Sequence, residues 1–208
     1  MGRLSGMSFA RRQRAALAHL LDELGPFAPT KCEGWRTQEL AAHLYIREHR
    51  PLALPGIGSK RFSEQTRRIQ VEALHTLGYP ALVQAIRSPG WVMRPLDRLV
   101  NTSELFIHHE DVLRANDRHQ SLTAAEQQEL WPIAAVLGRR TQFRFGHQIR
   151  VTRSDTGAQA VWGTGARVVH LVGLPSELLL HLSGRDGDVT VTGEPADVER
   201  WDKAISSL

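Results

Sequence analysis

The sequence of 208 residues has little cysteine and few aromatic residues, with one cysteine, two tyrosines and an aromatic fraction of 6%. A single cysteine excludes an internal disulfide framework. It also excludes a zinc cluster held by thiolates alone, which needs three or four cysteines. No run approaches the ~18 apolar residues that a membrane-spanning helix requires, and the N-terminus has no apolar segment typical of a secretion signal. We therefore expect a cytoplasmic protein with no membrane partner.

The sequence also lacks a strong excess of either charge, because its 26 basic residues are nearly balanced by 22 acidic ones. The basic residues are spread along the chain, whereas a nucleic-acid-binding protein more often concentrates them on one face. The tightest basic clusters fall in amphipathic helical patterns, which are typical of solvated faces. They are Arg11, Arg12 and Arg14, then Lys60, Arg61, Arg67 and Arg68. We expect no nucleic-acid partner.

Histidine is the residue type in excess, with ten copies. Hydrophobic residues make up 41% of the chain, which is enough to build one large core or two small ones. With a single cysteine available, any bound metal ion must be held mainly by histidine and carboxylate side chains. The positions of the histidines on the expected helices therefore decide whether a metal site is plausible.

Periodicity predicts helices first and strands afterwards. Helices are expected over residues 7–24, from a Thr37 cap to Pro51, over 63–87 with an interruption at 78–80, from an Asn101 or Thr102 cap to 115, and over 123–139. Strands are expected at 148–153, 158–162, 168–172 and 188–192, with helices at 176–183 and from 195. This order predicts an all-α domain over 1–142 followed by a small α+β domain over 143–208.

The helix that begins near residue 101 places three polar side chains on an otherwise apolar side. Glu104 and His108 are four residues apart and lie about 40° apart around the helix axis. Asp111 returns to the same side three residues later. Two carboxylates and an imidazole are costly to bury without a partner, and a divalent cation would satisfy all three.

The second helix offers a further ligand, His43, among the small and apolar residues Leu40, Ala41, Ala42 and Leu44. Helical bundles build metal sites from inward side chains on facing helices. His43, Glu104 and His108 would supply two imidazoles and one carboxylate, a set that leaves a fourth position open in catalytic zinc sites. Asp111 would then accept a proton from a ligand imidazole or contact bound water.

Simpler interpretations compete with this one. His108 is equally explained as a core histidine paired with Glu104, since a single Glu-x-x-x-His spacing is common on helices. Glu39 repeats that spacing with His43 and admits a two-metal site, although further carboxylates are not obvious. Cys32 is expected to pack rather than to react. Arg185, in a glycine-flanked turn, is either a surface residue or a bidentate partner for an anionic substrate.

Three segments resemble one family in the same order along the chain. Residues 32–44 (CEGWRTQELAAHL) resemble the opening motif of mycothiol-dependent DinB-like metalloenzymes, which include the maleylpyruvate isomerases. Residues 101–114 (NTSELFIHHEDVLR) resemble the second motif of that family, and residues 173–185 (GLPSELLLHLSGR) resemble its C-terminal domain. The similarity is closer to another branch than to the isomerases themselves.

The resemblance implies a DinB-like four-helix bundle with a small C-terminal α/β domain of sterol-carrier type. It implies a divalent metal, most often zinc, on His43, Glu104 and His108, and mycothiol as thiol cosubstrate. The implied reaction is thiol transfer to a small electrophile or its isomerisation. From their own positions in the sequence, Asp111 and Arg185 are expected to assist it, and Arg185 also to bind the cosubstrate. A monomer or a homodimer is expected.

Two other functions stay open. The first is a non-catalytic protein that binds a metal ion or a small ligand. In the form of a module that encloses an apolar ligand or protein partner, it predicts His43 and Glu104 too far apart to share an ion. A metal-dependent hydrolase would use bound water and no thiol.

Overall fold

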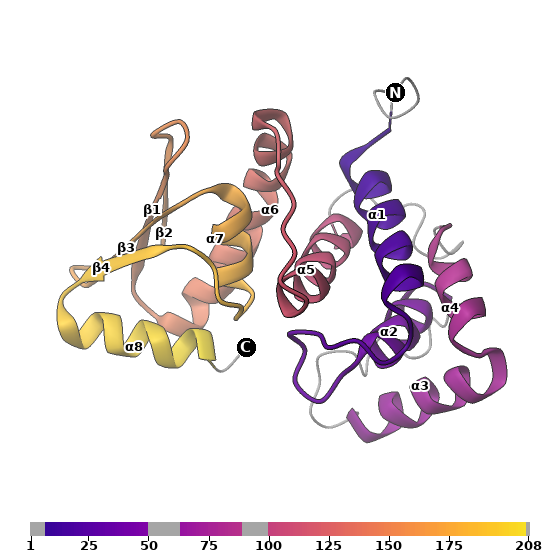
Figure 1. Cartoon of the computed structure of the whole chain (residues 1–208). Coiled ribbons are helices and arrows are strands. Elements are labelled where there is room, and N and C mark those ends of the chain that lie inside the picture. The colour runs from indigo at the N-terminus through magenta and orange to yellow at the C-terminus, as the bar shows by residue number, and fades with distance from the viewer. Residues whose placement is uncertain (1–6, 50–62, 89–99, 207–208) are drawn as a thin grey trace. The chain divides into compact units, whose positions relative to one another are not determined.

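The computed structural model describes residues 7–49, 63–88 and 100–206, and these form two compact units, Met1–Gln120 and Ser121–Leu208 (Figure 1). The first unit is helical, and the second combines helices with a small sheet. Within the described ranges, we find no helix with the length and apolar character needed to cross a bilayer.

The N-terminal unit consists of α1 (Phe9–Leu24), α2 (Thr37–His49), α3 (Ser63–Leu77), α4 (Tyr79–Ile86) and α5 (Val100–Ala115). α1 packs against α4 and α5, while α2 packs against α3 and α4. Apolar positions at helical spacing supply the core, including Leu17 and Leu21 from α1, Leu40 and Ile46 from α2, and Leu105 and Val112 from α5. This core fixes α2 and α5, the two helices that carry the histidines of interest.

The helices of this unit follow the sequence pattern, with differences at their starts. The interruption expected at residues 78–80 is confirmed, since Gly78, at φ 76°, separates α3 from α4. Thr37 was expected to cap α2 but is its first residue, and its hydroxyl donates to the Gly25 carbonyl. The backbone N–H of Arg36 instead donates to the Glu39 carboxylate. Pro51 lies outside the described residues.

The C-terminal unit begins with α6 (Ala124–Phe145), whose start is fixed by a capping box between Thr123 and Glu126. It continues with β1 (Gln148–Arg153), β2 (Gln159–Trp162), β3 (Val168–Gly173), α7 (Pro175–Leu182), β4 (Thr190–Gly193) and α8 (Pro195–Ser206). The strand order is β2-β1-β3-β4. The central β1–β3 pair is parallel, and the outer pairs are antiparallel.

Helix α6 differs from expectation in its length and in its partners. It was expected to end near residue 139 but continues to Phe145, because the Phe145 ring is buried against Trp201 of α8. α6 packs on α7, α8 and the sheet, so the compact units divide at Gln120 and Ser121. The change in composition had placed the boundary after residue 142. The composition changes where helices give way to strands. The compact units divide earlier in the sequence, because the buried face of α6 packs on the C-terminal elements.

A substitution at Gly138 tests the packing of α6 on the sheet. A Cβ atom at this position would lie 1.9 Å from Cζ3 of Trp162, whose ring is buried. We expect Gly138→Ala to lower the free energy of unfolding by about 1–3 kcal/mol in urea titrations, because overpacking outweighs the ~1 kcal/mol that alanine gains over glycine in a helix. Gly138→Ala should cost much less in a Trp162→Leu background; equal costs in both backgrounds would contradict this packing.

The buried His181 of α7 makes the stability of the C-terminal unit depend on pH. Burial lowers the pKa of His181 below its ordinary value of 6.5, and its Nε2 accepts a hydrogen bond from the Trp201 indole. The unfolded chain therefore takes up the proton more readily, so stability is complete above pH 6.5 and falls as the pH drops towards the folded-state pKa. We expect His181→Gln to flatten this part of the urea-unfolding profile, and an unchanged slope would contradict the prediction.

Candidate metal centre

The side chains of α2 and α5 meet in a group of three potential ligands. His43, Glu104 and His108 each offer an atom within 4.8 Å of the others. Oε2 of Glu104 lies 3.5 Å from Nε2 of His108. The His43 ring meets the His108 ring edge-on, with centroids 5.3 Å apart. The structure thus brings together the three residues that helical spacing selected, and their binding of a metal stays a prediction.

Glu104 is held ionised by the positive groups around it. Burial raises the pKa of Glu104, but the hydrogen bond from His108 and the positive charges of Arg47, His108 and His43 outweigh burial and bring the pKa down to about 2. The Arg47 guanidinium lies with Nε 3.4 Å from Oε2 of Glu104. Glu104 therefore offers an anionic oxygen, a potential ligand, across the physiological pH range.

Arg47 is a part of the centre that the sequence reasoning missed. It is almost fully buried, and its Nη1 donates to Oδ1 of Asn101 at 2.5 Å. Asn101 or Thr102 was expected to cap this helix, but α5 begins at Val100 and both residues are buried in its first turn. The available signal was the spacing, since Arg47 follows His43 by one helical turn and faces the same neighbour.

Asp111 fixes the orientation of the His108 ring. Its Oδ2 lies 3.0 Å from Nδ1 of His108, and Asp111 is only 1% exposed. Burial lowers the pKa of His108, but the hydrogen bonds to Asp111, Cys32 and Glu104 outweigh it and leave the pKa well above 6.5. With the ring proton on Nδ1, Nε2 faces Glu104. This is the contact that the sequence predicted for Asp111, whose catalytic role stays a prediction.

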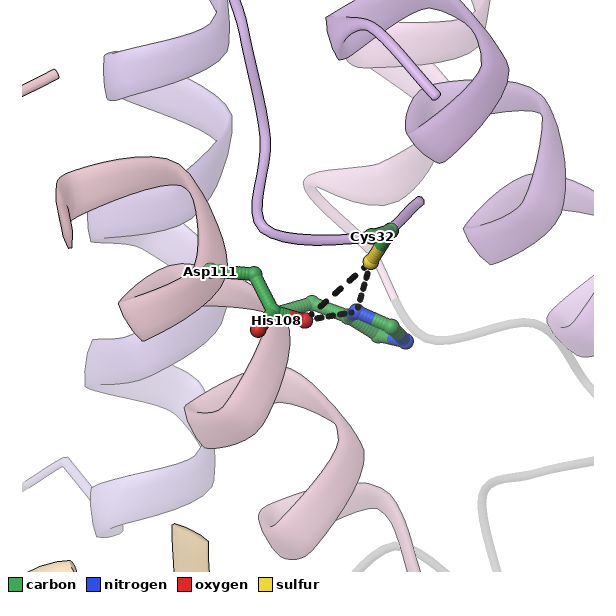
Figure 2. A group of neighbouring side chains, drawn as sticks. All are labelled: Cys32, His108 and Asp111. Carbon is green, nitrogen blue, oxygen red and sulfur yellow. Dashed lines mark hydrogen bonds and ion pairs between the residues drawn. The ribbon is translucent and has the colours of Figure 1, made fainter. Parts of the chain in front are cut away.

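Cys32 approaches the same pair from the loop before α2 (Figure 2). Its thiol donates to Oδ2 of Asp111 at 3.2 Å and lies 3.7 Å from Nδ1 of His108. The backbone N–H of Lys31 donates to the Asp111 carbonyl and anchors the loop to α5. We had expected Cys32 to serve packing alone. A loop has no periodic pattern, so nothing in the sequence indicated this contact.

The arrangement of Cys32, His108 and Asp111 differs from that of a catalytic triad. In a triad, the imidazole contacts the nucleophile through one ring nitrogen and the acid through the other. Here both the thiol and the carboxylate approach Nδ1. The ring cannot relay a proton between them in this geometry, so the group does not support nucleophilic catalysis by Cys32.

Two candidate residues remain, Glu39 in the N-terminal unit and Arg185 in the C-terminal unit. Glu39 accepts hydrogen bonds from the Arg36 backbone and the Gln38 side chain, and it joins no cluster of three ligands among the described residues. Arg185 belongs to the C-terminal unit, where it is half-buried and its Nη1 donates to the Ser183 carbonyl. Its role at the centre stays a prediction.

The residues that follow His108 face a different environment. Burial lowers the pKa of His109 to about 4, and its Nδ1 lies 2.8 Å from Oε1 of Gln13. Glu110 is 6% exposed and accepts hydrogen bonds from Arg114 and Gln120. Adjacent histidines of α5 therefore differ in charge, because only His108 faces carboxylates.

Comparison with solved structures supports a known fold. The crystal structure of the mycothiol-dependent maleylpyruvate isomerase matches with 17% identity and a TM-score of 0.50, over 89% of this chain and 91% of that chain. The structure of a histidine-to-alanine mutant of that isomerase matches with the same identity and coverage and a TM-score of 0.44. No protein-family model and no curated protein sequence matches the chain. The similarity suspected from three motifs is thus confirmed at the level of the fold.

Removing the charge of Asp111 tests its effect on His108. Asp111→Asn keeps a hydrogen-bond acceptor but loses the carboxylate charge beside Nδ1. We expect the pKa of His108 to fall, as measured from the ring-proton chemical shifts of chelator-treated protein. Glu110→Gln removes the neighbouring buried carboxylate, which faces Arg114, and should leave the His108 titration unchanged. Equal His108 titrations in Asp111→Asn and wild type would refute this electrostatic role.

Proposed function

We propose that the N-terminal unit holds a divalent metal ion through His43, Glu104 and His108. The observation that carries the proposal is the convergence of three ligand atoms within 4.8 Å, from two helices fixed by the core. Two imidazoles and one carboxylate suit Zn²⁺ and leave a position open for another ligand. The same set accepts nickel, iron or manganese, so zinc is the first choice rather than the sole one.

The residues around the three ligands fit this role. Arg47 helps to keep Glu104 ionised, and Asp111 faces Nδ1 of His108, so Nε2, beside Glu104, is the nitrogen that would give up its proton to an ion. Carboxylate contacts of this kind on a ligand imidazole are common in metal proteins. The ring of Trp35 lies against His43, with centroids 5.0 Å apart, and restricts the rotation of the His43 ring.

At a finer level, we propose that the N-terminal unit is a DinB-like bundle and that the C-terminal unit is a sterol-carrier-like α/β domain. The support is the three motifs in order and the similarity to the mycothiol-dependent maleylpyruvate isomerase over 89% of the chain. Because identity is 17%, this similarity supports the arrangement of the chain and not a particular substrate.

The activity we propose is a reaction of mycothiol with a small electrophile, either transfer of the thiol or isomerisation. When bound, a divalent ion supplies positive charge that favours the deprotonated, nucleophilic form of a thiol. Glu104 and His108 hold the ion site in place, Asp111 fixes the His108 tautomer, and Arg185 pairs with an anionic group of substrate or cosubstrate. The protein is proposed to act in the cytoplasm, as a monomer or a homodimer.

One observation argues against a non-catalytic module in which His43 and Glu104 share no ion, whereas a non-catalytic protein that holds a metal ion would have the same ligand spacing. The module predicts that His43 and Glu104 lie too far apart to share an ion, whereas their ligand atoms lie within 4.8 Å. A hydrolase that uses bound water has the same three ligands, so only an assay without thiol distinguishes it.

The metal assignment is tested by substitution of His108. We expect wild-type protein loaded with zinc to retain about one ion per chain after dialysis and His108→Ala to retain almost none, because three protein ligands define the site. Elemental analysis gives the content. His49→Ala is the matched control, since His49 lies on α2 stacked against Tyr45 and should retain the ion. Zinc content unaffected by His108→Ala would disprove the assignment.

Turnover tests the thiol requirement separately. Zinc-loaded wild type should convert at least one member of a panel of small electrophiles, maleylpyruvate included, only when mycothiol is present. Glu104→Gln should lose this activity, because it removes the anionic ligand while keeping the side-chain size. Conversion of esters or amides without thiol would favour the hydrolase instead.

A further inference from the structure

Cys32, His108 and Asp111 form a second group of three metal-ligating side chains (Figure 2). It lies on the other side of the His108 ring from the first set: Cys32 and Asp111 face Nδ1, whereas Glu104 faces Nε2. Two elements build the group, the loop before α2 and the helix α5, and the Lys31–Asp111 backbone hydrogen bond joins them. Nothing in the proposed function uses the Cys32 thiol.

The spacing of the three ligand atoms is within a few tenths of an ångström of what a metal ion requires. The separations are 3.7 Å for Sγ and Nδ1, 3.2 Å for Sγ and Oδ2, and 3.0 Å for Nδ1 and Oδ2. Tetrahedral zinc, with bonds of about 2.3 Å to sulfur and about 2.0–2.1 Å to nitrogen and oxygen, separates such atoms by about 3.3–3.6 Å. Shifts of a few tenths of an ångström, within the freedom of side-chain torsions, would complete the geometry.

We propose that this group binds a thiophilic divalent cation, Zn²⁺ or Cd²⁺, through Sγ of Cys32, Nδ1 of His108 and Oδ2 of Asp111. Thiolate, imidazole and carboxylate are all zinc ligands, and the sulfur favours soft ions over hard ones. Asp111 is almost completely buried and Cys32 is half-buried, so the group is anchored on the protein side and accessible on the thiol side. Three protein ligands leave a position for water.

The proton count makes this site an alternative to the first set. With the ion bound, Cys32 is a thiolate, Nδ1 carries no proton and Nε2 carries the ring proton, while the displaced protons go to solvent. A protonated Nε2 cannot bind an ion beside Glu104. One His108 ring therefore completes one set at a time, and a soft ion at Cys32 would exclude metal from the His43 set. The inference goes beyond the proposed function and does not rest on it.

Cobalt titration of the full chain tests the site directly. Co²⁺ bound to a thiolate shows a charge-transfer absorption in the near ultraviolet, which histidine and carboxylate ligands do not produce. We expect this absorption in wild type and in His43→Ala, because His43 belongs only to the first set. We expect its loss in Cys32→Ser, which removes the only thiol in the chain. Loss of the absorption in His43→Ala would overturn the proposal, because the sulfur would then serve the His43 set.

A second measurement needs no variant. Alkylation of the single cysteine by iodoacetamide should slow roughly tenfold or more in the presence of saturating Cd²⁺, because a metal-bound thiolate is no longer a free nucleophile. An unchanged alkylation rate together with no cobalt–thiolate absorption would overturn the site. Zinc retention without a thiolate signal contradicts this inference alone. Absence of mycothiol-dependent turnover in zinc-loaded Cys32→Ser, which keeps only the His43 set, contradicts only the proposed function.

Discussion

The buried imidazole of His108 is the group around which the candidate site of the N-terminal unit is arranged. It stands between two carboxylates, with Asp111 at 3.0 Å from Nδ1 and Glu104 at 3.5 Å from Nε2. Two carboxylates near one ring would be costly to bury unless positive charge balanced them. Without metal, the protonated His108 ring and Arg47 supply that charge. A divalent ion can take the place of the ring's charge, which is why a site built of hydrogen bonds can also be a metal site.

The periodic part of the site could be predicted from the sequence. Glu104, His108 and Asp111 recur at helical spacing on α5, and His43 lies among small residues on α2, so their faces follow from the helix geometry. Arg47 obeys the same rule, one turn after His43, and was overlooked because arginine is usually exposed. Cys32 could not be predicted, because its position depends on how the loop folds back on α5.

The division of the chain shows the same limit. The residue types predicted a domain boundary after residue 142, close to where α6 gives way to β1. In the structure, however, the whole of α6 packs with the C-terminal unit. Local signals such as the capping box of Thr123 and Glu126 indicate where a helix begins. They do not indicate which other helices or strands that helix packs against. Gly138 of α6 and Trp162 of β2 approach closely although they are 24 residues apart in the sequence, and only the folded unit reveals this contact.

The fold and the side chains of the candidate site support different kinds of conclusion. A match over 89% of the chain at 17% identity shows how the chain is arranged, and many activities can share one arrangement. Chemistry depends on which atoms converge, and around His108 the atoms define two ligand sets rather than one. We propose an ion for each set, and because both sets use the same ring through opposite nitrogens, the position of a single ring proton would decide which set can hold its ion.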